Sequence, residues 1–307
     1  MKCGSTLERT LQAGHFAVTA ELGPPRGTDI AAVEKKAGQL RGAVDAVNVT
    51  DNQSAMVHMS SMACATLLLR QGVEPVMQMT CRDRNRIAIQ SDILGASALG
   101  IRNILCISGD HHSFGDQPGA KKVYDIDSTQ LVALARRLRD ERRILASQDE
   151  VCGEVPLFIG TAANPFASPL ELRAQLLAKK VAAGADFAQT QCVFDIGMFA
   201  DWMEKVRSLG AHTKCRILAG IIPLKSLRMA RYMVENVPGI MIPDSILKRM
   251  EAAPKEKAAA EGIRICCEII RQVKEIEGVA GIHIMAIEWE HRVPDIVEKA
   301  GLLPRPA

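Results

Sequence analysis

The chain has 307 residues, of which 48% are hydrophobic and 24% charged, and its formal net charge is +3. This near-neutral balance gives no argument for nucleic acid or a membrane surface as a partner. No segment reaches the roughly 18 uninterrupted apolar residues that a membrane-spanning helix needs, and the N-terminus lacks the apolar core of a signal peptide. We therefore expect a cytoplasmic protein.

Short apolar runs alternate with longer amphipathic segments along the whole chain. Most of the runs are nearly continuous, which is typical of parallel strands buried on both faces. The expected strands are residues 16–21, 46–50, 75–80, 103–107, 157–162, 187–191, 216–220 and 281–287. The expected helices are residues 29–41, 84–99, 128–147, 169–183, 199–209, 225–234 and 255–276.

This alternation predicts an α/β protein with a parallel sheet. An open sheet would favour a glycine-rich phosphate loop after one strand, and no such pattern occurs in the sequence. Eight strand–helix units, with no linker or low-complexity segment between them, instead indicate a closed (β/α)8 TIM barrel. Such barrels typically take about 250 residues. We expect one domain over residues 1–307.

Nine cysteines are scattered along the chain without a Cys-x-x-Cys pair. Cys64, Cys106 and Cys192 lie among apolar residues, where cysteine behaves as a small hydrophobic side chain. The adjacent His111 and His112 lack the spaced partners of a zinc site and are interpreted as solvated loop residues. We expect structural cysteines in a reducing compartment and no metal site.

Polar side chains follow nearly every expected strand, at the end where a TIM barrel carries its active site. Each one alone could cap a helix or make a turn, but together they favour a site for a polar ligand. The residues at these positions include Glu21, Asp51, Thr80, Asp110, Asn164 and Gln191.

Two carboxylates are candidates for catalysis. Glu21 ends an apolar strand just before Gly23 and two prolines. Partial desolvation there would favour its protonated form, which suits a general acid near neutral pH. The alternative is an ion pair with a residue such as Arg26. Asp110 lies on a turn beside Gly109, where the backbone can approach a ligand closely.

The segment from Ala20 to Arg26, with a glutamate followed by Pro-Pro-Arg, resembles the first-strand signature of methylenetetrahydrofolate reductases. Further motifs resemble this family in the same order and cover nearly the whole chain. They are Val47-Asn48-Val49-Thr50, Met79-Thr80-Cys81 with Asp83, Gly109-Asp110, Thr190-Gln191 with Phe194-Asp195, and Gly220-Ile221-Ile222-Pro223.

The resemblance implies a flavin-dependent barrel that reduces 5,10-methylenetetrahydrofolate to 5-methyltetrahydrofolate by a ping-pong scheme. Glu21 would protonate N10 of the folate, and flavin N5 would deliver hydride to the resulting iminium carbon. Asp110 would favour that cation and, with Thr50 and Gln191, contact the substrate. The residues implied in cofactor binding are Thr50, Gln78, Thr80, Cys81, Ser108, Gly109, Asp110, Asn164 and Lys180, the last near the cofactor's phosphates.

The chain departs from the family's bacterial pattern around the dinucleotide end of the flavin and the reductant face. The departures are Gln78 and Asn164 in place of histidines, Ser108 in place of an arginine, Gly160 in place of an aromatic residue, and Ala286-Ile287-Glu288-Trp289 after the last strand. The flavin is thus expected to be FAD, with FMN as the alternative. The electron donor is NAD(P)H or a partner protein.

We also expect an oligomer or a hetero-complex, and a short form of the family without a regulatory domain. Two other interpretations stay open. One is a pterin-binding barrel methyltransferase that acts with a corrinoid protein. The other is a non-catalytic flavin- or folate-binding subunit of a larger redox complex.

Overall fold

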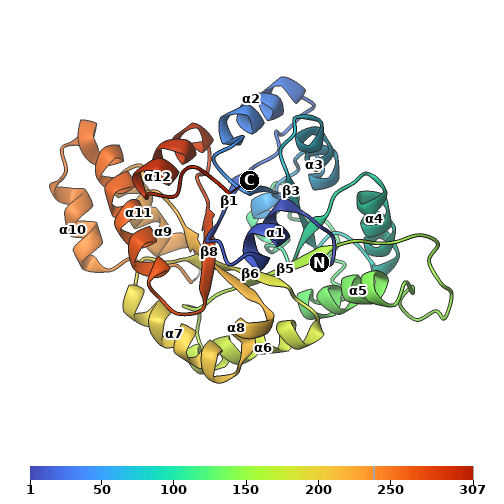
Figure 1. Cartoon of the computed structure of the whole chain (residues 1–307). Helices are drawn as coiled ribbons and strands as arrows, with labels where there is room; N and C mark the ends of the chain where they lie inside the picture. Colours follow the sequence, from blue (N-terminus) through green and yellow to red (C-terminus); the bar gives the residue numbers. More distant parts are fainter. Residues whose placement is uncertain (238, 307) are drawn as a thin grey trace.

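Eight parallel strands form a closed barrel in chain order in the computed structural model, which describes residues 1–237 and 239–306 (Figure 1). The strands are β1 Ala17–Leu22, β2 Ala46–Val49, β3 Pro75–Thr80, β4 Asn103–Ile107, β5 Phe158–Ala163, β6 Phe187–Cys192, β7 Arg216–Ile221 and β8 Val279–Ile284. The first and last strands pair directly and close the ring. The predicted (β/α)8 barrel is therefore confirmed.

Helices surround the barrel and connect successive strands. They are α1 Thr6–Gln12, α2 Ile30–Leu40, α3 Ser61–Arg70, α4 Arg86–Ala98, α5 Ser128–Asp140, α6 Arg173–Ala183, α7 Ile196–Ser208, α8 Ala211–Lys214, α9 Leu227–Asn236, α10 Asp244–Ala252, α11 Ala258–Lys274 and α12 Val293–Lys299. Single 3₁₀ turns are η1 Gln53–Ala55, η2 His112–Phe114, η3 Leu170–Leu172, η4 Lys255–Lys257 and η5 Glu290–Arg292. In the described part of the chain, none of the helices is long and apolar enough to cross a membrane.

The predicted helix over residues 128–147 is wrong in its second half. The helix α5 ends at Asp140, and the chain then forms a projecting loop (Figure 1). Arg142 and Ala146 have φ angles of 51° and 62°, which an α-helix does not accommodate. The eighth strand is also shorter than predicted, because it ends at Ile284 and residues 285–287 follow it as loop. The helices α1, α3, α8, α10 and α12 were not predicted.

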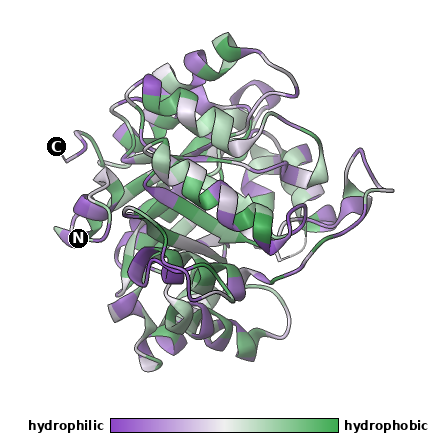
Figure 2. Cartoon of the chain, turned by 90° about the vertical axis from the view of Figure 1, so that its right-hand side faces the viewer, coloured by the Kyte–Doolittle hydropathy of each residue, from purple (hydrophilic) through white to green (hydrophobic). Residues whose placement is uncertain are grey.

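Strand residues alternate between the helices and the barrel interior, and the interior is apolar at its N-terminal end. Phe158 and Phe187 stack there with their ring centroids 5.1 Å apart. A Cβ atom at Gly160 would lie 2.2 Å from the Phe187 ring, so the strand needs a glycine at this point. Leu7 and Leu11 of α1 pack on the same cluster and close this end. Figure 2 shows the apolar strands within helices of mixed hydropathy.

One layer further along the strands, the barrel interior becomes polar. Asn48 on β2 and Gln189 on β6 exchange two amide hydrogen bonds of 2.7 and 3.0 Å across the barrel. The Gln189 amide nitrogen also lies 3.2 Å from the hydroxyl of Thr19 on β1. These buried groups therefore have the partners that burial requires. They form a polar floor beneath the C-terminal end of the barrel.

Candidate active site

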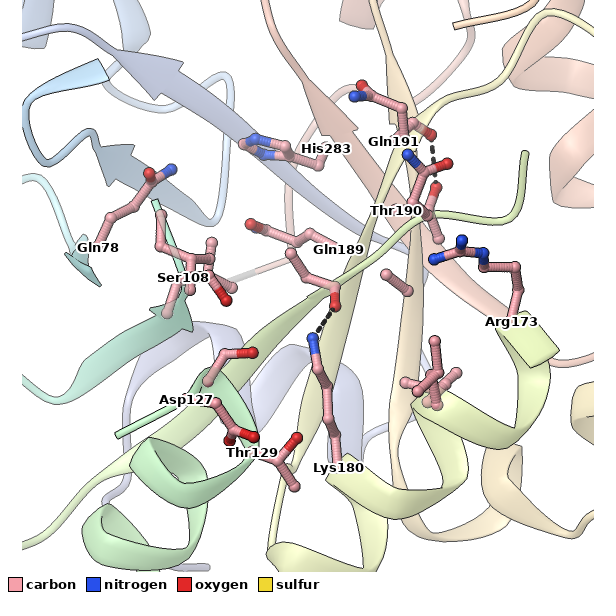
Figure 3. Close-up of a pocket in the computed structure, with 18 of the residues that line it drawn as sticks. Gln78, Ser108, Asp127, Thr129, Arg173, Lys180, Gln189, Thr190, Gln191 and His283 are labelled. Carbon is pink, nitrogen blue, oxygen red and sulfur yellow. Dashed lines mark hydrogen bonds between the residues drawn. The ribbon is translucent and has the colours of Figure 1, made fainter. Parts of the chain in front are cut away.

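A cavity of about 720 Å³ opens above this floor, at the C-terminal ends of the strands (Figure 3). Its size is in the range of small-molecule sites. Its walls combine carboxylates, amides, basic groups and apolar side chains from most of the strands and from the helices α5 and α6. The structure thus places a mixed polar and apolar cavity where a TIM barrel carries its active site.

Glu21 lies at the edge of the cavity floor, at the end of β1, with 21% of its side chain exposed. The Gln78 amide nitrogen donates to Glu21 Oε2 over a long 3.5 Å, and His283 Nε2 is 3.8 Å from the same oxygen. Arg26, the partner considered from the sequence, pairs with Asp116 instead. Within the described residues, no lysine or arginine is paired with Glu21. Its carboxyl can therefore take up and release a proton without breaking a strong ion pair.

Asp110 is an exposed residue at the rim of the cavity, and the loops after β2 and β4 hold it in place. Its Oδ2 accepts a 3.0 Å hydrogen bond from the backbone N–H of Ser54. Ser54 and Ala55 have φ angles of 55° and 56°. Non-glycine residues occupy this left-handed region at a cost, and such strain clusters at functional sites.

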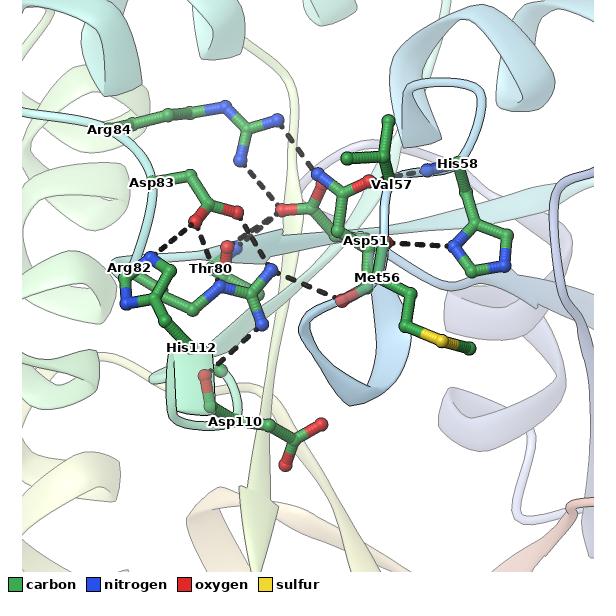
Figure 4. Close-up of polar contacts among 12 residues, drawn as sticks. Asp51, Met56, Val57, His58, Thr80, Arg82, Asp83, Arg84, Asp110 and His112 are labelled. Carbon is green, nitrogen blue, oxygen red and sulfur yellow. Dashed lines mark hydrogen bonds and ion pairs between the residues drawn. The ribbon is translucent and has the colours of Figure 1, made fainter. Parts of the chain in front are cut away.

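A buried arginine joins the loops that carry Asp110 (Figure 4). The Arg82 guanidinium donates to the backbone carbonyls of Asn52 and Asp110 at 3.1 and 3.2 Å and pairs with Asp83 at 2.7 Å. The hydrogen bond with Asp83 raises the pKa of Arg82, so the side chain stays charged. The solvated position predicted for His112 is wrong. It is buried, with Nε2 3.3 Å from Asp83.

A second ion pair, between the buried Asp51 and the half-buried Arg84, lies beside the first. Asp51 accepts from the backbone N–H and hydroxyl of Thr80 at 2.9 and 3.0 Å. Two nitrogens of Arg84 bind the same carboxylate at 2.7 and 3.2 Å, and Arg84 also pairs with Asp92. Asp51 and Thr80 therefore belong to the scaffold that fixes the loops.

The structure brings together seven of the residues predicted for the site. Lining the cavity are Glu21, Gln78, Ser108, Asp110, Asn164, Lys180 and Gln191. The other four, Thr50, Thr80, Cys81 and Gly109, are not among its lining residues. The Thr50 hydroxyl donates to Gln53, and Cys81 lies in the hydrophobic core, where burial raises its pKa to about 12. Their roles toward a ligand stay predictions.

Lys180 of α6 is a half-buried cation at the cavity wall. Its Nζ donates to the backbone carbonyl of Ala162 at 2.8 Å, and burial lowers its pKa. No carboxylate in the described chain pairs with it. Ser128 and Thr129, at the N-terminus of α5, line the same wall. Asp127, whose side chain caps α5, lies on the same wall and acts on the charge of Lys180 without forming an ion pair with it. A lysine that lacks an ion pair can still bind an anionic ligand.

Several lining residues were missed from the sequence, among them Gln189, His283 and Arg173. His283 stands alone as a polar side chain in an apolar strand, and Gln189 begins the polar run Gln189-Thr190-Gln191 within β6. That pattern is the signal that could have found them, because a polar residue in a buried strand needs a partner inside the barrel. Among the described residues, no group of three or more His, Cys, Asp or Glu side chains is placed to hold a metal ion.

Fold and cavity together define a TIM-barrel protein with a mixed polar and apolar cavity at the C-terminal ends of the strands. The family model for methylenetetrahydrofolate reductase matches residues 6–301. The chain therefore belongs to the methylenetetrahydrofolate reductase family.

Named relatives agree with this assignment. Methylenetetrahydrofolate reductase 1 of Schizosaccharomyces pombe is 28% identical over 243 residues, which are 75% of this chain and 36% of the relative. The 5,10-methylenetetrahydrofolate reductase of Salmonella typhimurium is 23% identical over 76% of this chain and 73% of its own length. The chain thus spans about a third of the yeast protein and most of the bacterial one.

A solved structure from Clostridium thermocellum, described as binding two copies of 5-methyl-5,6,7,8-tetrahydrofolic acid, superposes with a TM-score of 0.65. The alignment covers 97% of this chain and 99% of that one, at 12% identity. EDTA monooxygenase from Chelativorans superposes with a TM-score of 0.56 at 10% identity. At these identities the similarity concerns the fold alone.

Replacing Asp51 with alanine tests the loop scaffold. The substitution leaves Arg84 and the Thr80 N–H without their carboxylate, and breaking a buried pair in this way costs about 3–5 kcal/mol. The free energy of unfolding from urea titration should fall by that amount. Arg231→Ala is the control, because its pair with Glu251 is exposed and should contribute less than about 1 kcal/mol. Equal stabilities of the two variants would show that Asp51 is not part of a buried scaffold.

Proposed function

We propose that this chain reduces 5,10-methylenetetrahydrofolate to 5-methyltetrahydrofolate with a bound flavin. The observation that carries the proposal is Glu21, a carboxyl that faces a ligand-sized cavity with an amide and an imidazole as neighbours and no lysine or arginine paired with it in the described chain. Family membership and the names of the relatives support the reaction. The folate-binding description of the Clostridium protein supports the substrate class.

The cavity residues fit a flavin. Lys180, with Ser128 and Thr129 at the start of α5, suits a phosphate group, because the lysine has only a carbonyl partner. Leu105 and Leu177 are among the apolar side chains that line the cavity, and such side chains suit a flat ring. FAD and FMN both carry a phosphate, and FAD is the proposed form. When bound, the flavin supplies a hydride.

The chain's own residues handle the proton and the orientation of the folate. Glu21 gives a proton to N10 of the folate ring, a kind of transfer worth about 10²- to 10⁴-fold in rate. Gln191 binds the pterin through its amide nitrogen, because its amide oxygen already accepts from the backbone N–H of Cys192 at 2.9 Å. Asp110 keeps a negative charge at the rim and favours the cation that forms when the folate ring opens.

Electrons reach the flavin from NAD(P)H or from a partner protein in a hetero-complex. A corrinoid-linked methyltransferase would bind a pterin without a flavin phosphate. Lys180, whose hydrogen-bond partner in the described chain is a backbone carbonyl and not a carboxylate, therefore favours the reductase. Turnover with an artificial electron donor separates a catalytic chain from a merely flavin-binding subunit.

Replacing Glu21 with glutamine tests the proposed reaction. With the flavin reduced by dithionite under anaerobic conditions, stopped-flow mixing with methylenetetrahydrofolate should reoxidise it about 10²- to 10⁴-fold more slowly in Glu21→Gln than in the wild type. Reduction of the flavin by dithionite should be unchanged, because that step needs no proton from Glu21. Glu277→Gln, at an exposed glutamate, is the control. Equal reoxidation in all three proteins would remove Glu21 from the mechanism.

Replacing Lys180 with methionine tests the phosphate site. The loss of a charged hydrogen bond, about 1.5–3 kcal/mol, should weaken FAD binding about tenfold to a hundredfold. Riboflavin, which has no phosphate, should bind both proteins equally. Lys179→Met, at the exposed neighbouring lysine on the same helix, is the control. Titrations by flavin fluorescence measure the affinity of each of the three proteins for FAD and for riboflavin, and an unchanged FAD affinity in Lys180→Met would place the phosphate elsewhere.

A further inference from the structure

A second cavity, of about 470 Å³, lies at the opposite end of the barrel from the candidate active site. Its walls come from the loop between α1 and β1, from α8, and from the residues with which β7 and β8 begin. Because all the strands are parallel, these residues meet at the N-terminal end of the barrel. Phe158 and Phe187, with the Asn48–Gln189 pair above them, fill the barrel interior between the two cavities. The second cavity is therefore separate from the proposed flavin and folate site.

Three basic side chains line this cavity, and none of its lining residues in the described chain carries a carboxylate. They are His15 in the loop after α1, His212 on α8, and Arg216, the first residue of β7. Within the described residues, none of the three side chains forms an ion pair or a hydrogen bond. By contrast, Arg82 and Arg139 are each paired with carboxylates of the protein. The uncompensated charge at this cavity therefore favours an anionic ligand.

The imidazole of His212 has an unsatisfied nitrogen. Its Nδ1 is buried and has no hydrogen-bond partner in the part of the chain that the structure describes. Such atoms are few in folded proteins, and a bound water or ion is one of their usual partners. The turn before β8 packs closely against this histidine, because a Cβ atom at Gly278 would lie 3.4 Å from the Cβ atom of His212. The unsatisfied ring is thus held in the cavity wall by its surroundings.

The strand β8 begins irregularly at the same wall. Where it pairs with β7, Val279 is opposite Ile217, and the next pair is Gly281 with Leu218. Ala280 is thus an extra residue between the two pairs, and it lines the cavity together with Val279. Bulges of this kind concentrate at the rims of barrels and beside functional sites, where they change the direction of the chain. This local departure from regular pairing shapes the cavity.

The remaining wall is apolar and lies in positively charged surroundings. Leu11 and Phe16 line the cavity, and the ammonium group of Lys274 lies 5.9 Å from the centroid of the Phe16 ring. The carboxylate nearest in sequence is Glu277, whose side chain is 81% exposed and lies 3.8 Å from Arg207. The cavity therefore combines basic groups with apolar surface, which suits a ligand that has both an anionic group and an apolar part.

We propose that this cavity is a second binding site, which takes a small organic anion with a carboxylate or phosphate group on a compact apolar body. Arg216 binds the anionic group, because a guanidinium can donate two parallel hydrogen bonds to either of these groups. His15 and His212 donate further hydrogen bonds from their rings. Leu11 and Phe16 contact the apolar part. The site is independent of the proposed function, because none of its lining residues lines the candidate active site.

Nuclear magnetic resonance of the full chain, labelled at the ring carbons of its seven histidines, tests the site. Signals missing from His15→Gln and His212→Gln identify the two rings, and the first suffices if the second variant fails to fold. Phenyl phosphate should shift these signals until they saturate, and phenol, its neutral analogue, should leave them in place. An equal effect of benzoate would extend the site to carboxylates, whereas a shift with phenyl phosphate alone would restrict it to phosphates. Signals that neither anion moves would overturn the proposal.

Replacing Arg216 with methionine tests the role of the guanidinium group. Arg216 is exposed, so the fold should remain, but the affinity for phenyl phosphate should fall about tenfold to a hundredfold with the loss of a charged hydrogen bond. Arg231→Met, which removes an exposed arginine elsewhere, is the matched control. Lys180→Met should bind the probe as the wild type does, because Lys180 lies at the other cavity. Equal weakening in Arg216→Met and Arg231→Met, or weakening in Lys180→Met alone, would contradict the proposal.

Discussion

Two amide hydrogen bonds between Asn48 and Gln189 join opposite walls of the barrel, and the site is built on them. A polar group inside a barrel is costly unless it is partnered, so this layer is possible because the amides satisfy each other. Below it, Phe158 and Phe187 fill the interior and α1 closes the end. The cavity can therefore open in one direction only, toward the C-terminal ends of the strands.

Charge is distributed unevenly around that opening. On the side of β2 and β3, the buried Arg82 and the half-buried Arg84 are paired with carboxylates and tie the loops together. On the side of α6, Lys180 and Arg173 have backbone carbonyls as their hydrogen-bond partners. The charges of Arg82 and Arg84 are thus compensated within the protein, whereas Lys180 and Arg173 are available to an anion. This asymmetry separates the scaffold from the proposed phosphate site.

The strands and the location of the site could be predicted from the sequence, because buried parallel strands are continuous apolar runs and the residues after them meet at one end. It was harder to predict which residues of each strand point into the barrel. Gln189 and His283 were passed over because a polar residue in a buried strand shows its role only once the inward face is known. Thr80 and Cys81 were placed at the cofactor from motif likeness. In the structure, Asp51 binds Thr80, and the core encloses Cys81.

Contacts between distant segments account for the other differences. His112 is buried because Asp83, from the preceding strand–helix loop, lies beside it. The early end of α5 at Asp140 depends on left-handed residues that the charged, amphipathic sequence does not reveal. Arg26, considered from the sequence as a partner of Glu21, forms an ion pair with Asp116 in the loop after β4. For His112 and Arg26 the deciding partner is remote in sequence, and spacing alone does not identify it.

The central claim is that one cavity brings a flavin and a folate together so that hydride passes between them. The most direct measurement is an absorbance titration of the FAD-loaded wild-type chain with 5-methyltetrahydrofolate under anaerobic conditions. The account predicts that the blue absorbance band of the oxidised flavin bleaches as the folate is added and returns when methylenetetrahydrofolate is supplied. A flavin that stays oxidised in the presence of saturating folate, or a chain that binds no flavin, would contradict it.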